Sequence, residues 1–402
     1  MYKVQCAAKI HSTLYILHCT KMNRIGIIGS GTMGIGIAQV AATSGCKVFL
    51  YDANPAQTEK SLQNLQQTLN KLAAKQKISA ERSAKIYDSI KPCSNISDFK
   101  DCDLVIEAII ENKEIKSKVF QNVEETVSEN CVIASNTSSI SITSLSSELK
   151  NPERFIGIHF FNPAPLMPLV EVIPGLLTDK NLPHQIYDLM VSWGKTPVIA
   201  KDVPGFIVNR LARPFYGEAL RIAEEHIATP EQIDDAMRTL GNFKMGPFEL
   251  MDLIGIDVNF SVTKTVYQDY FFDPKYKPSL VQQRMSEAKL LGRKTGKGFY
   301  DYSEKSQESR AKSQDIADEK LYEMIFMRII SMLINEAVEA KRLKIANDED
   351  LELAMQKGVN YPKGLLAWGK EIGYEKASKT LQNLYEEYQE ERYRQSPALR
   401  AM

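Results

Sequence analysis

The stretch Gly29-Ser30-Gly31-Thr32-Met33-Gly34 decides the fold of this chain, because its two flanks have complementary patterns. Residues 24–28, before it, form a short apolar, β-branched run that is typical of a buried strand. Residues 35–42, after it, have the composition of a helix, and residues 46–51 form a second apolar run that ends at Asp52. The order strand, glycine-rich turn, helix and strand predicts one β-α-β unit.

The spacing of these glycines is typical of a dinucleotide site: the first allows a tight turn, the second lets the backbone approach a pyrophosphate, and the third lets helix and strand pack closely. The helix N-terminus faces the phosphate charge, and Asp52, about 20 residues further on, can accept hydrogen bonds from the ribose hydroxyls. Its carboxylate would repel a 2′-phosphate, so we expect NAD rather than NADP. A glycine-rich turn in an unrelated α/β protein is the alternative. The predicted cofactor contacts here are Gly29, Gly31, Thr32, Met33, Gly34 and Asp52.

Composition and charge exclude several classes of protein. At 402 residues the chain is long enough for two or three domains. Lys+Arg and Asp+Glu each total 50, so there is no overall field to attract nucleic acid or an anionic membrane, and no apolar run reaches membrane-spanning length. The six cysteines and five histidines are dispersed, without C-x-x-C spacing or a metal-binding pair. We therefore expect no metal, nucleic-acid or membrane partner, and reduced cysteines as in an intracellular protein.

The first 21 residues carry three lysines and no acid, which faintly suggests a targeting peptide. They contain no arginine, however, and Lys9 and His11 interrupt the apolar stretch. Met22 is itself a natural start for the first strand. We expect residues 1–21 to be dispensable and the protein to be cytoplasmic, with a mitochondrial presequence as the alternative.

Strands and helices alternate along the first half of the chain. Further strands are expected at 103–108, 131–135, 155–160 and 169–173, and helices within 57–90 and from about 111 to 127. This alternation predicts an α/β, Rossmann-type, doubly wound sheet that is mostly parallel. Ligands bind beyond the carboxyl ends of such strands, where the sequence places the loops 136–139 and 159–163.

Beyond Pro204-Gly205 the chain reads as helical and contains a repeat. A displacement of 118 positions aligns Arg210 with Arg328 and Glu218 with Glu336, within one unbroken register. Two copies of one all-α helical domain are therefore expected after the sheet. The predicted divisions are an extension at 1–21, a Rossmann domain at 22–204, a first helical domain at 205–302, a polar linker at 303–318 and a second, degenerate helical domain at 319–402.

Five further motifs carry a family resemblance. They are Asn136-Thr137-Ser138-Ser139, His159-Phe160-Phe161-Asn162-Pro163, the run 202–210, the run 245–252 and the run 292–300. Together they resemble the L-3-hydroxyacyl-CoA dehydrogenases, most closely the bacterial 3-hydroxybutyryl-CoA dehydrogenases, over residues 22 to about 302. The second helical copy is similar to that of longer members with a duplicated C-terminal domain. The resemblance implies reversible, NAD-dependent oxidation of an L-3-hydroxyacyl-CoA thioester to the 3-oxoacyl-CoA, with short acyl chains favoured.

The resemblance also implies roles for individual residues. His159 matches the family's catalytic base and Glu171 its partner, and Ser138 and Asn209 match the polar residues that hold the substrate. The cofactor contacts expected outside the glycine-rich turn are Glu111, Lys116, Asn136, Ser138, Asn162 and Lys294. Thr68 and Lys75 stand where the family often has a serine and a lysine that touch coenzyme A. The threonine is a departure from that pattern.

These residue types suit the oxidation of a secondary alcohol. An imidazole can take the hydroxyl proton near neutral pH while a hydride leaves the carbon. A carboxylate bonded to the other ring nitrogen fixes the tautomer and stabilises the imidazolium as it forms. Ser138 and Asn209 can donate hydrogen bonds to the substrate's oxygens and so set its orientation.

Each assignment has a structural alternative. His159 could be a structural histidine, and Glu171 could belong to a structural ion pair. Asn209 could cap the helix that follows Pro204-Gly205, and Ser138 could be a turn residue. The lysines around Lys75 could form a solvated helix face. For the whole chain, the alternatives are a dehydrogenase of a free hydroxy or sugar acid and a non-catalytic NAD-binding protein.

The second helical copy is not expected to serve an active site. Met327 occupies the position equivalent to Asn209, and a thioether cannot donate a hydrogen bond. The resemblance implies that in single-copy members the helical domain mediates dimerisation. We therefore expect the second copy to replace the partner subunit, which would give a pseudo-dimeric monomer, with a homodimer as the alternative.

Overall fold

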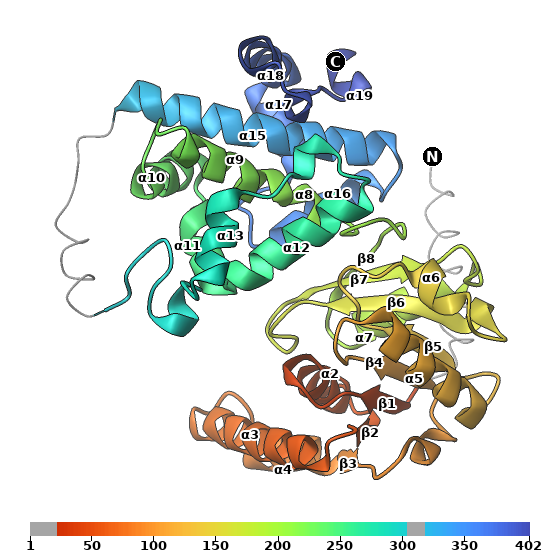
Figure 1. Cartoon of the computed structure of the whole chain (residues 1–402). Coiled ribbons are helices and arrows are strands. Elements are labelled where there is room, and N and C mark those ends of the chain that lie inside the picture. Colours follow the sequence, from red (N-terminus) through yellow and green to blue (C-terminus); the bar gives the residue numbers. More distant parts are fainter. Residues whose placement is uncertain (1–21, 304–317) are drawn as a thin grey trace, which may run out of the picture. The chain divides into compact units, whose positions relative to one another are not determined.

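The computed structural model describes residues 22–303 and 318–402, which divide into two compact units (Figure 1). We call the first the sheet unit; it contains residues 22–137 and 142–197. The second, the helical unit, contains residues 138–141 and the described residues from 198 to 402. The predicted extension at 1–21 and nearly all of the predicted linker lie outside the described residues.

The sheet has eight strands in the order β3-β2-β1-β4-β5-β6-β7-β8. Their bounds are β1 Arg24–Ile28, β2 Lys47–Tyr51, β3 Ile90–Pro92, β4 Leu104–Glu107, β5 Val132–Ser135, β6 Phe155–Phe160, β7 Leu169–Pro174 and β8 Thr196–Ile199. The neighbours from β3 to β6 are parallel, whereas β6 and β7 are antiparallel. This order, with β1 between β2 and β4, is that of a Rossmann sheet, which confirms the predicted fold class.

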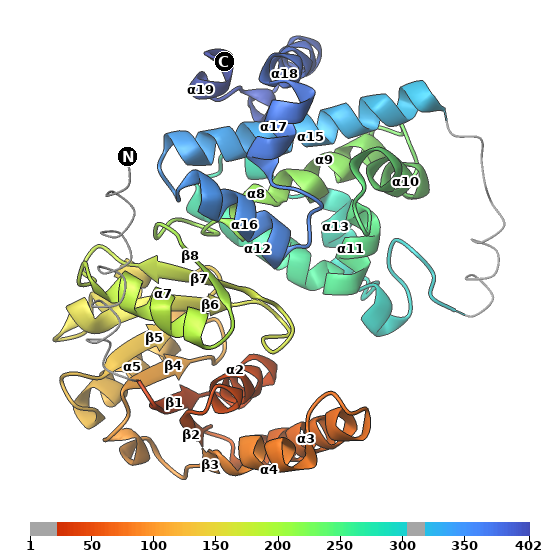
Figure 2. The same ribbon diagram turned by 180° about the vertical axis from the view of Figure 1, so that it is seen from behind.

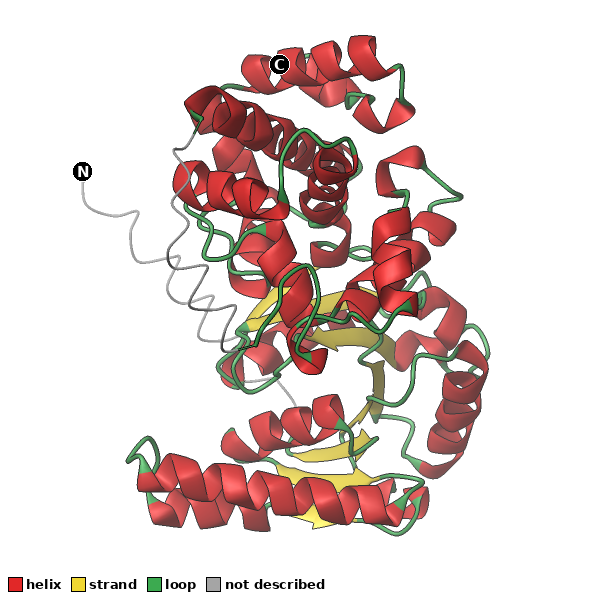
Figure 3. Ribbon diagram, turned by 60° about the vertical axis from the view of Figure 1, so that its left-hand side comes forward, coloured by secondary structure: helices red, strands yellow, loops and turns green. Residues whose placement is uncertain are grey.

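Helices lie on both sides of this sheet (Figure 3). They are α2 Thr32–Thr43, α3 Pro55–Ala74, α4 Ala80–Asp88, α5 Lys113–Thr126, α6 Ile142–Ser146 and α7 Leu182–Ser192. Because both faces are covered, β4 and β5 are buried along their whole length, and apart from their last residues, Glu107 and Ser135, they are apolar runs in the sequence. The strands β3 and β8, of three and four residues, were not predicted, since such short segments show no hydrophobic period.

The helical unit contains two related sets of helices. The first set is α8 Val208–Leu211, α9 Arg213–Glu224, α10 Pro230–Gly241, α11 Pro247–Ile254, α12 Ile256–Asp269 and α13 Leu280–Glu287. The second set is α15 Glu319–Arg342, α16 Asp348–Gly358, α17 Leu365–Ile372, α18 Tyr374–Tyr388 and α19 Pro397–Arg400. Helices α11 and α17 begin and end 118 positions apart, as the repeat predicts. Figures 1 and 2 show α15 lying along α9, so the two sets pack on each other.

The repeat extends to single hydrogen bonds. The carboxylate of Asp234 accepts hydrogen bonds from the first-turn N–H groups of α11, at 2.9 Å each. Glu352, 118 positions further on, does the same for the first turn of α17, at 2.8 and 3.0 Å. An acidic side chain at a helix N-terminus satisfies otherwise unpaired donors. Two copies of one local design are therefore present in the helical unit.

Candidate active site

The glycine-rich turn joins β1 to α2, and its glycines serve different purposes. Gly29 has a φ of 98°, and a Cβ there would lie 2.5 Å from the carbonyl oxygen of Ala108. A Cβ on Gly34 would lie 1.8 Å from the carbonyl oxygen of Gly29. Gly31, at the N-cap of α2, has an ordinary φ of −63°, and a Cβ there would meet no described atom within 4 Å. The space beside Gly31 therefore fits the close approach of a pyrophosphate, as expected for a dinucleotide.

Asp52 follows β2 and is bonded to the glycine-rich turn. Its Oδ2 accepts hydrogen bonds from the backbone N–H of Ser30 at 2.7 Å and from the Ser30 hydroxyl at 3.0 Å. Its Oδ1 accepts one from the N–H of Asn54 at 2.9 Å. These bonds hold the half-exposed carboxylate beside the turn, where the sequence predicted a ribose contact.

A buried ion pair at the end of β4 was not predicted as such. The ammonium of Lys116 on α5 lies 2.6 Å from Oε1 of Glu107, and both side chains are buried. The other oxygen of Glu107 accepts a hydrogen bond from Ser135 at 2.7 Å. Lys116 also lies 3.2 Å from the partly exposed carboxylate of Glu111, which accepts a hydrogen bond from Thr137 at 2.6 Å. Sequence analysis missed Glu107, although an acidic residue inside an apolar strand was a usable signal.

His159 and Glu171 form a second buried polar pair. They lie directly opposite each other in the antiparallel register of β6 and β7. His159 Nδ1 lies 2.7 Å from Glu171 Oε2, and the exposed fractions of the two residues are 6% and 0%. Because the carboxylate accepts from Nδ1–H, the other ring nitrogen can accept a proton. The pairing that the sequence predicted for these residues is present.

The glycine-rich turn and four of the predicted or observed polar site residues lie at one edge of the sheet. Gly29, Asp52, Glu107, Asn136 and His159 each stand at or just beyond the carboxyl end of a strand, and these strands are parallel to one another. The amide oxygen of Asn136 accepts a hydrogen bond from the N–H of Phe160 at 2.8 Å, which joins the end of β5 to that of β6. This is the edge at which doubly wound sheets bind ligands.

Two predicted substrate residues, Ser138 and Asn209, belong to the helical unit. The loop that contains Ser138 is joined to the chain before α8 by a hydrogen bond from Ser141 to Asp202 at 2.9 Å. Asn209 is half-exposed within α8, and Ile207 rather than Asn209 is the N-cap of that helix. The interpretation of Asn209 as a helix cap is therefore wrong.

The remaining predicted contacts lie at more exposed positions. The ammonium of Lys294 is paired with Asp257, with distances of 2.5 and 2.7 Å to the two carboxylate oxygens. Asn162 is exposed in the loop after β6. The hydroxyl of Thr68 donates to the carbonyl of Asn64 within α3, and Lys75 ends that helix. Within the described ranges there is no group of three or more His, Cys, Asp or Glu side chains that could hold a metal, and no helix long and apolar enough to cross a membrane.

The comparisons with known proteins match both units. The model of the NAD-binding domain of 3-hydroxyacyl-CoA dehydrogenases matches residues 24–203, and the model of their C-terminal domain matches twice, at residues 205–302 and 324–402. The chain belongs to the 3-hydroxyacyl-CoA dehydrogenase family. It is an NAD-dependent oxidoreductase, as predicted.

Relatives in this family cover most of the chain. The 3-hydroxyadipyl-CoA dehydrogenase of Escherichia coli is 37% identical, over 94% of this chain and 96% of that protein. The 3-hydroxybutyryl-CoA dehydrogenase of Clostridioides difficile is 42% identical, over 70% of this chain and 99% of that protein. A crystal structure of 3-hydroxybutyryl-CoA dehydrogenase from Escherichia coli K12 superimposes with a TM-score of 0.88 at 35% identity, covering 95% of this chain and 98% of that one. The family, the fold and the cofactor predicted from sequence are thus confirmed.

Proposed function

We propose that this dehydrogenase oxidises short-chain L-3-hydroxyacyl-CoA thioesters, such as 3-hydroxybutyryl-CoA, and reduces the 3-oxoacyl-CoA in the reverse direction. The 3-hydroxybutyryl-CoA dehydrogenases among its relatives support the short chain. A dicarboxylic thioester is the second candidate, because the 3-hydroxyadipyl-CoA dehydrogenase matches almost the whole chain, second helical copy included. The observation that carries the chemistry is the buried 2.7 Å contact between His159 and Glu171.

In the proposed mechanism His159 is the general base. Its Nε2 takes the proton of the C3 hydroxyl, and Glu171 stabilises the resulting imidazolium through Nδ1. NAD supplies the acceptor for the hydride that leaves C3. Ser138 and Asn209 hold the substrate by hydrogen bonds and orient its C3 hydrogen. In the reverse direction the protonated imidazole returns the proton as the 3-oxo group is reduced.

The cofactor and coenzyme A assignments are part of the same proposal. The open space beside Gly31 supports a pyrophosphate at the glycine-rich turn, with Thr32 and Met33 at the helix start and Asp52 on the ribose. We propose that Lys116 acts chiefly by holding Glu111, because its ammonium is buried between two carboxylates. The further proposed contacts are Asn136, Ser138, Asn162 and Lys294 for NAD, and Thr68 and Lys75 for coenzyme A.

We further propose that the second helical copy takes the place of a partner subunit, which makes the protein a pseudo-dimeric monomer. Arg210 pairs with Glu336 and Arg328 pairs with Glu218, each at 2.6 Å. Each residue of one pair lies 118 positions from its counterpart in the other, so the contacts are reciprocal, as in a two-fold dimer interface. This symmetry supports the division of the helical part into 205–302 and 319–402, and the family match over residues 24–203 supports a Rossmann domain at 22–204.

A reducing compartment such as the cytoplasm is the location that we propose. The described cysteines 46, 93, 102 and 131 are free thiols. Burial raises the pKa of both Cys102 and Cys131 to about 12, so these thiols stay protonated and unreactive. Buried free thiols are typical of proteins that work where disulfides do not form.

The proposed base is tested by His159→Ala and Glu171→Gln, with His184→Ala on the surface of α7 as the control. H159A should lower kcat for acetoacetyl-CoA reduction about 10³-fold and E171Q about 10²-fold, because a general base contributes about 10²–10⁴-fold. NADH affinity, followed by fluorescence titration, should stay within about two-fold of the parent for all three variants. An H159A enzyme with more than about a third of the parental kcat would rule out the proposed role.

A further inference from the structure

The helix that carries Asn209 cannot hold its own conformation. Helix α8 has only four residues, and isolated helices this short are unstable in water. Pro214 in the first turn of α9 starts a new helix directly after it. The equivalent stretch of the second copy lies inside α15, which runs unbroken for 24 residues. The position of Asn209 must therefore be set by contacts that α8 makes with other elements.

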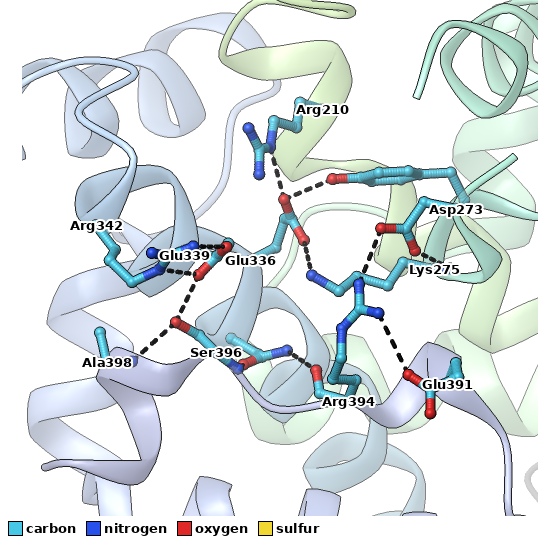
Figure 4. Close-up of polar contacts among 12 residues, drawn as sticks. Arg210, Asp273, Lys275, Glu336, Glu339, Arg342, Glu391, Arg394, Ser396 and Ala398 are labelled. Carbon is cyan, nitrogen blue, oxygen red and sulfur yellow. Dashed lines mark hydrogen bonds and ion pairs between the residues drawn. The ribbon is translucent and has the colours of Figure 1, made fainter. Parts of the chain in front are cut away.

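Arg210, the next residue after Asn209, makes such a contact with the second copy. Its Nε donates to Oε1 of Glu336 on α15 at 2.6 Å, and both side chains are buried. The hydroxyl of Tyr276 donates to the same oxygen at 2.6 Å, and the ammonium of Lys275 lies 3.6 Å from the other oxygen. Figure 4 shows the Glu336 carboxylate lying between Arg210 and Lys275. Glu336 thus anchors α8 to α15.

The charge of Glu336 makes this anchor rigid. Burial alone would raise the pKa of Glu336, but Arg210 and Lys275 lower it to about 2, so the carboxylate is ionised at neutral pH. Separating the pair would leave an uncompensated charge in the interior, which is strongly unfavourable. Glu336 therefore fixes the position of Arg210, and Arg210 in turn fixes the position of α8.

The chain that leads into α8 is bonded to the second copy as well. The backbone N–H of Lys201 donates to the carbonyl of Ile345 at 2.8 Å, and its ammonium donates to the carbonyl of Leu343 at 2.8 Å. The N–H of Ile199 donates to Oδ2 of Asp350 at 3.0 Å. The segment 199–210 is thus held by the second copy at both of its ends.

The reciprocal ion pair has the same distance between Nε and carboxylate, but different neighbours. Arg328 on α15 donates through Nε to Glu218 on α9 at 2.6 Å, and these side chains are as deeply buried as those of the first pair. Arg328, however, follows Met327, which cannot donate a hydrogen bond. The two pairs share their contribution to packing, but only one of them adjoins a proposed substrate residue.

We propose that Glu336 is a positioning residue for the dehydrogenase reaction. From the second helical copy it holds Arg210, and through Arg210 it sets the position in which α8 presents Asn209 to the substrate. This inference rests on the proposed substrate role of Asn209. The second copy, which has no substrate residue of its own at this position, is then a working part of the active enzyme.

The test compares Glu336→Gln with its matched control Glu218→Gln in the full chain. Each removes one buried carboxylate from a reciprocal pair, so both should lower Tm. The decrease should be smaller for E218Q, because Arg328 also lies 2.9 Å from the carboxylate of Glu225. E336Q should lower kcat/KM for acetoacetyl-CoA about 10- to 100-fold, since a small displacement of a substrate-holding group is enough for such a loss. E218Q should stay within about two-fold of the parent, and neither variant should change KM for NADH.

Two further variants separate the inference from its premise. If Asn209→Ala leaves activity intact, the role of Asn209 is wrong and the inference fails with it; if N209A impairs activity but E336Q does not, the inference alone is wrong. The double variant N209A/E336Q should be no slower than N209A, because Glu336 acts through Asn209. If the losses of activity caused by the two single variants add up in the double variant, the inference is wrong. If E336Q does not fold, E336D and E218D replace the two glutamine variants. In that comparison kcat/KM for acetoacetyl-CoA should fall about 3- to 10-fold for E336D and stay at the parental value for E218D.

Discussion

At the scale of single residues, the glycines of the glycine-rich turn differ in whether the folded chain itself requires them. Gly29 and Gly34 are required by the chain itself, since a Cβ at either position would overlap backbone atoms. Gly31 is not required in this way, because its φ is ordinary and the space around it is open. We therefore propose that the ligand, and not the fold, requires a glycine at this position.

This distinction predicts the behaviour of Gly31→Ala. The variant should unfold within about 2 °C of the parental Tm, because the added methyl group meets no atom of the protein. NADH affinity should fall at least about 10-fold, because that methyl group occupies the space that the pyrophosphate needs. Differential scanning fluorimetry and fluorescence titration measure the two quantities.

Gly217→Ala is the control for this variant, because the position is also open but lies inside α9. It should leave NADH affinity unchanged and stabilise the fold by about 0.5–1 kcal/mol. A G31A protein that binds NADH like the parent would show that the cofactor does not approach the backbone at Gly31.

The polar residues differ in how far the sequence could reveal them. His159 and Glu171 could be paired, since the family resemblance matches both and they stand on successive predicted strands, and their contact is present. Glu107 could not be assigned a partner, because its lysine is nine positions away on a helix whose rotation the sequence does not state. Lys116 was matched to a cofactor contact, but its burial between two carboxylates depends on packing that no motif spells out.

At the scale of elements, hydrophobic patterns predicted the strands better than their pairing. The six predicted strands are present, with ends that differ by at most one residue. That β7 runs antiparallel to β6 was not predicted, because apolar runs such as Leu169–Pro174 carry no information on direction. The separation of α8 from α9 follows from Pro214, yet the anchor that holds α8 could be found only in the structure.

The ion pair that joins α8 to α15 predicts an acid sensitivity. Because the folded pKa of Glu336, about 2, lies below the ordinary value of 4.5, the pair stabilises the fold fully above about pH 4.5. That stabilisation should be lost as the pH falls from about 4.5 towards 2, by about 3 kcal/mol. Guanidinium unfolding at a series of pH values gives the free energy of unfolding, which should fall less steeply with acid for E336Q than for the parent. An equal fall in both proteins would contradict the lowered pKa of Glu336.

At the scale of the whole molecule, two helical copies face each other through reciprocal contacts. The equivalence of Asp234 and Glu352, together with that of the two arginine–glutamate pairs, shows that the copies share one design. Sequence alone predicted the repeat, because its register is unbroken over many positions. It could not predict that Arg210 would pair with Glu336, the counterpart of Glu218, or that Glu218 would pair with Arg328, the counterpart of Arg210.

A pseudo-dimer of this kind should sediment as a single chain. Sedimentation velocity over about a 100-fold range of protein concentration should give one species of monomer mass, because the second copy already covers the face of the first. A dimer that persists at sub-micromolar concentration would contradict this prediction. A second dilution series with E218Q shows whether weakening the internal contact lets chains associate.

The specificity of the reaction for thioester and cofactor is the decisive measurement. NADH oxidation would be followed at 340 nm with acetoacetyl-CoA, with free acetoacetate, and with NADPH in place of NADH. We expect rapid turnover only with the thioester and NADH, because coenzyme A is the proposed handle and Asp52 disfavours a 2′-phosphate. Comparable turnover of free acetoacetate, or no turnover of the thioester by a protein that binds NADH, would contradict this expectation.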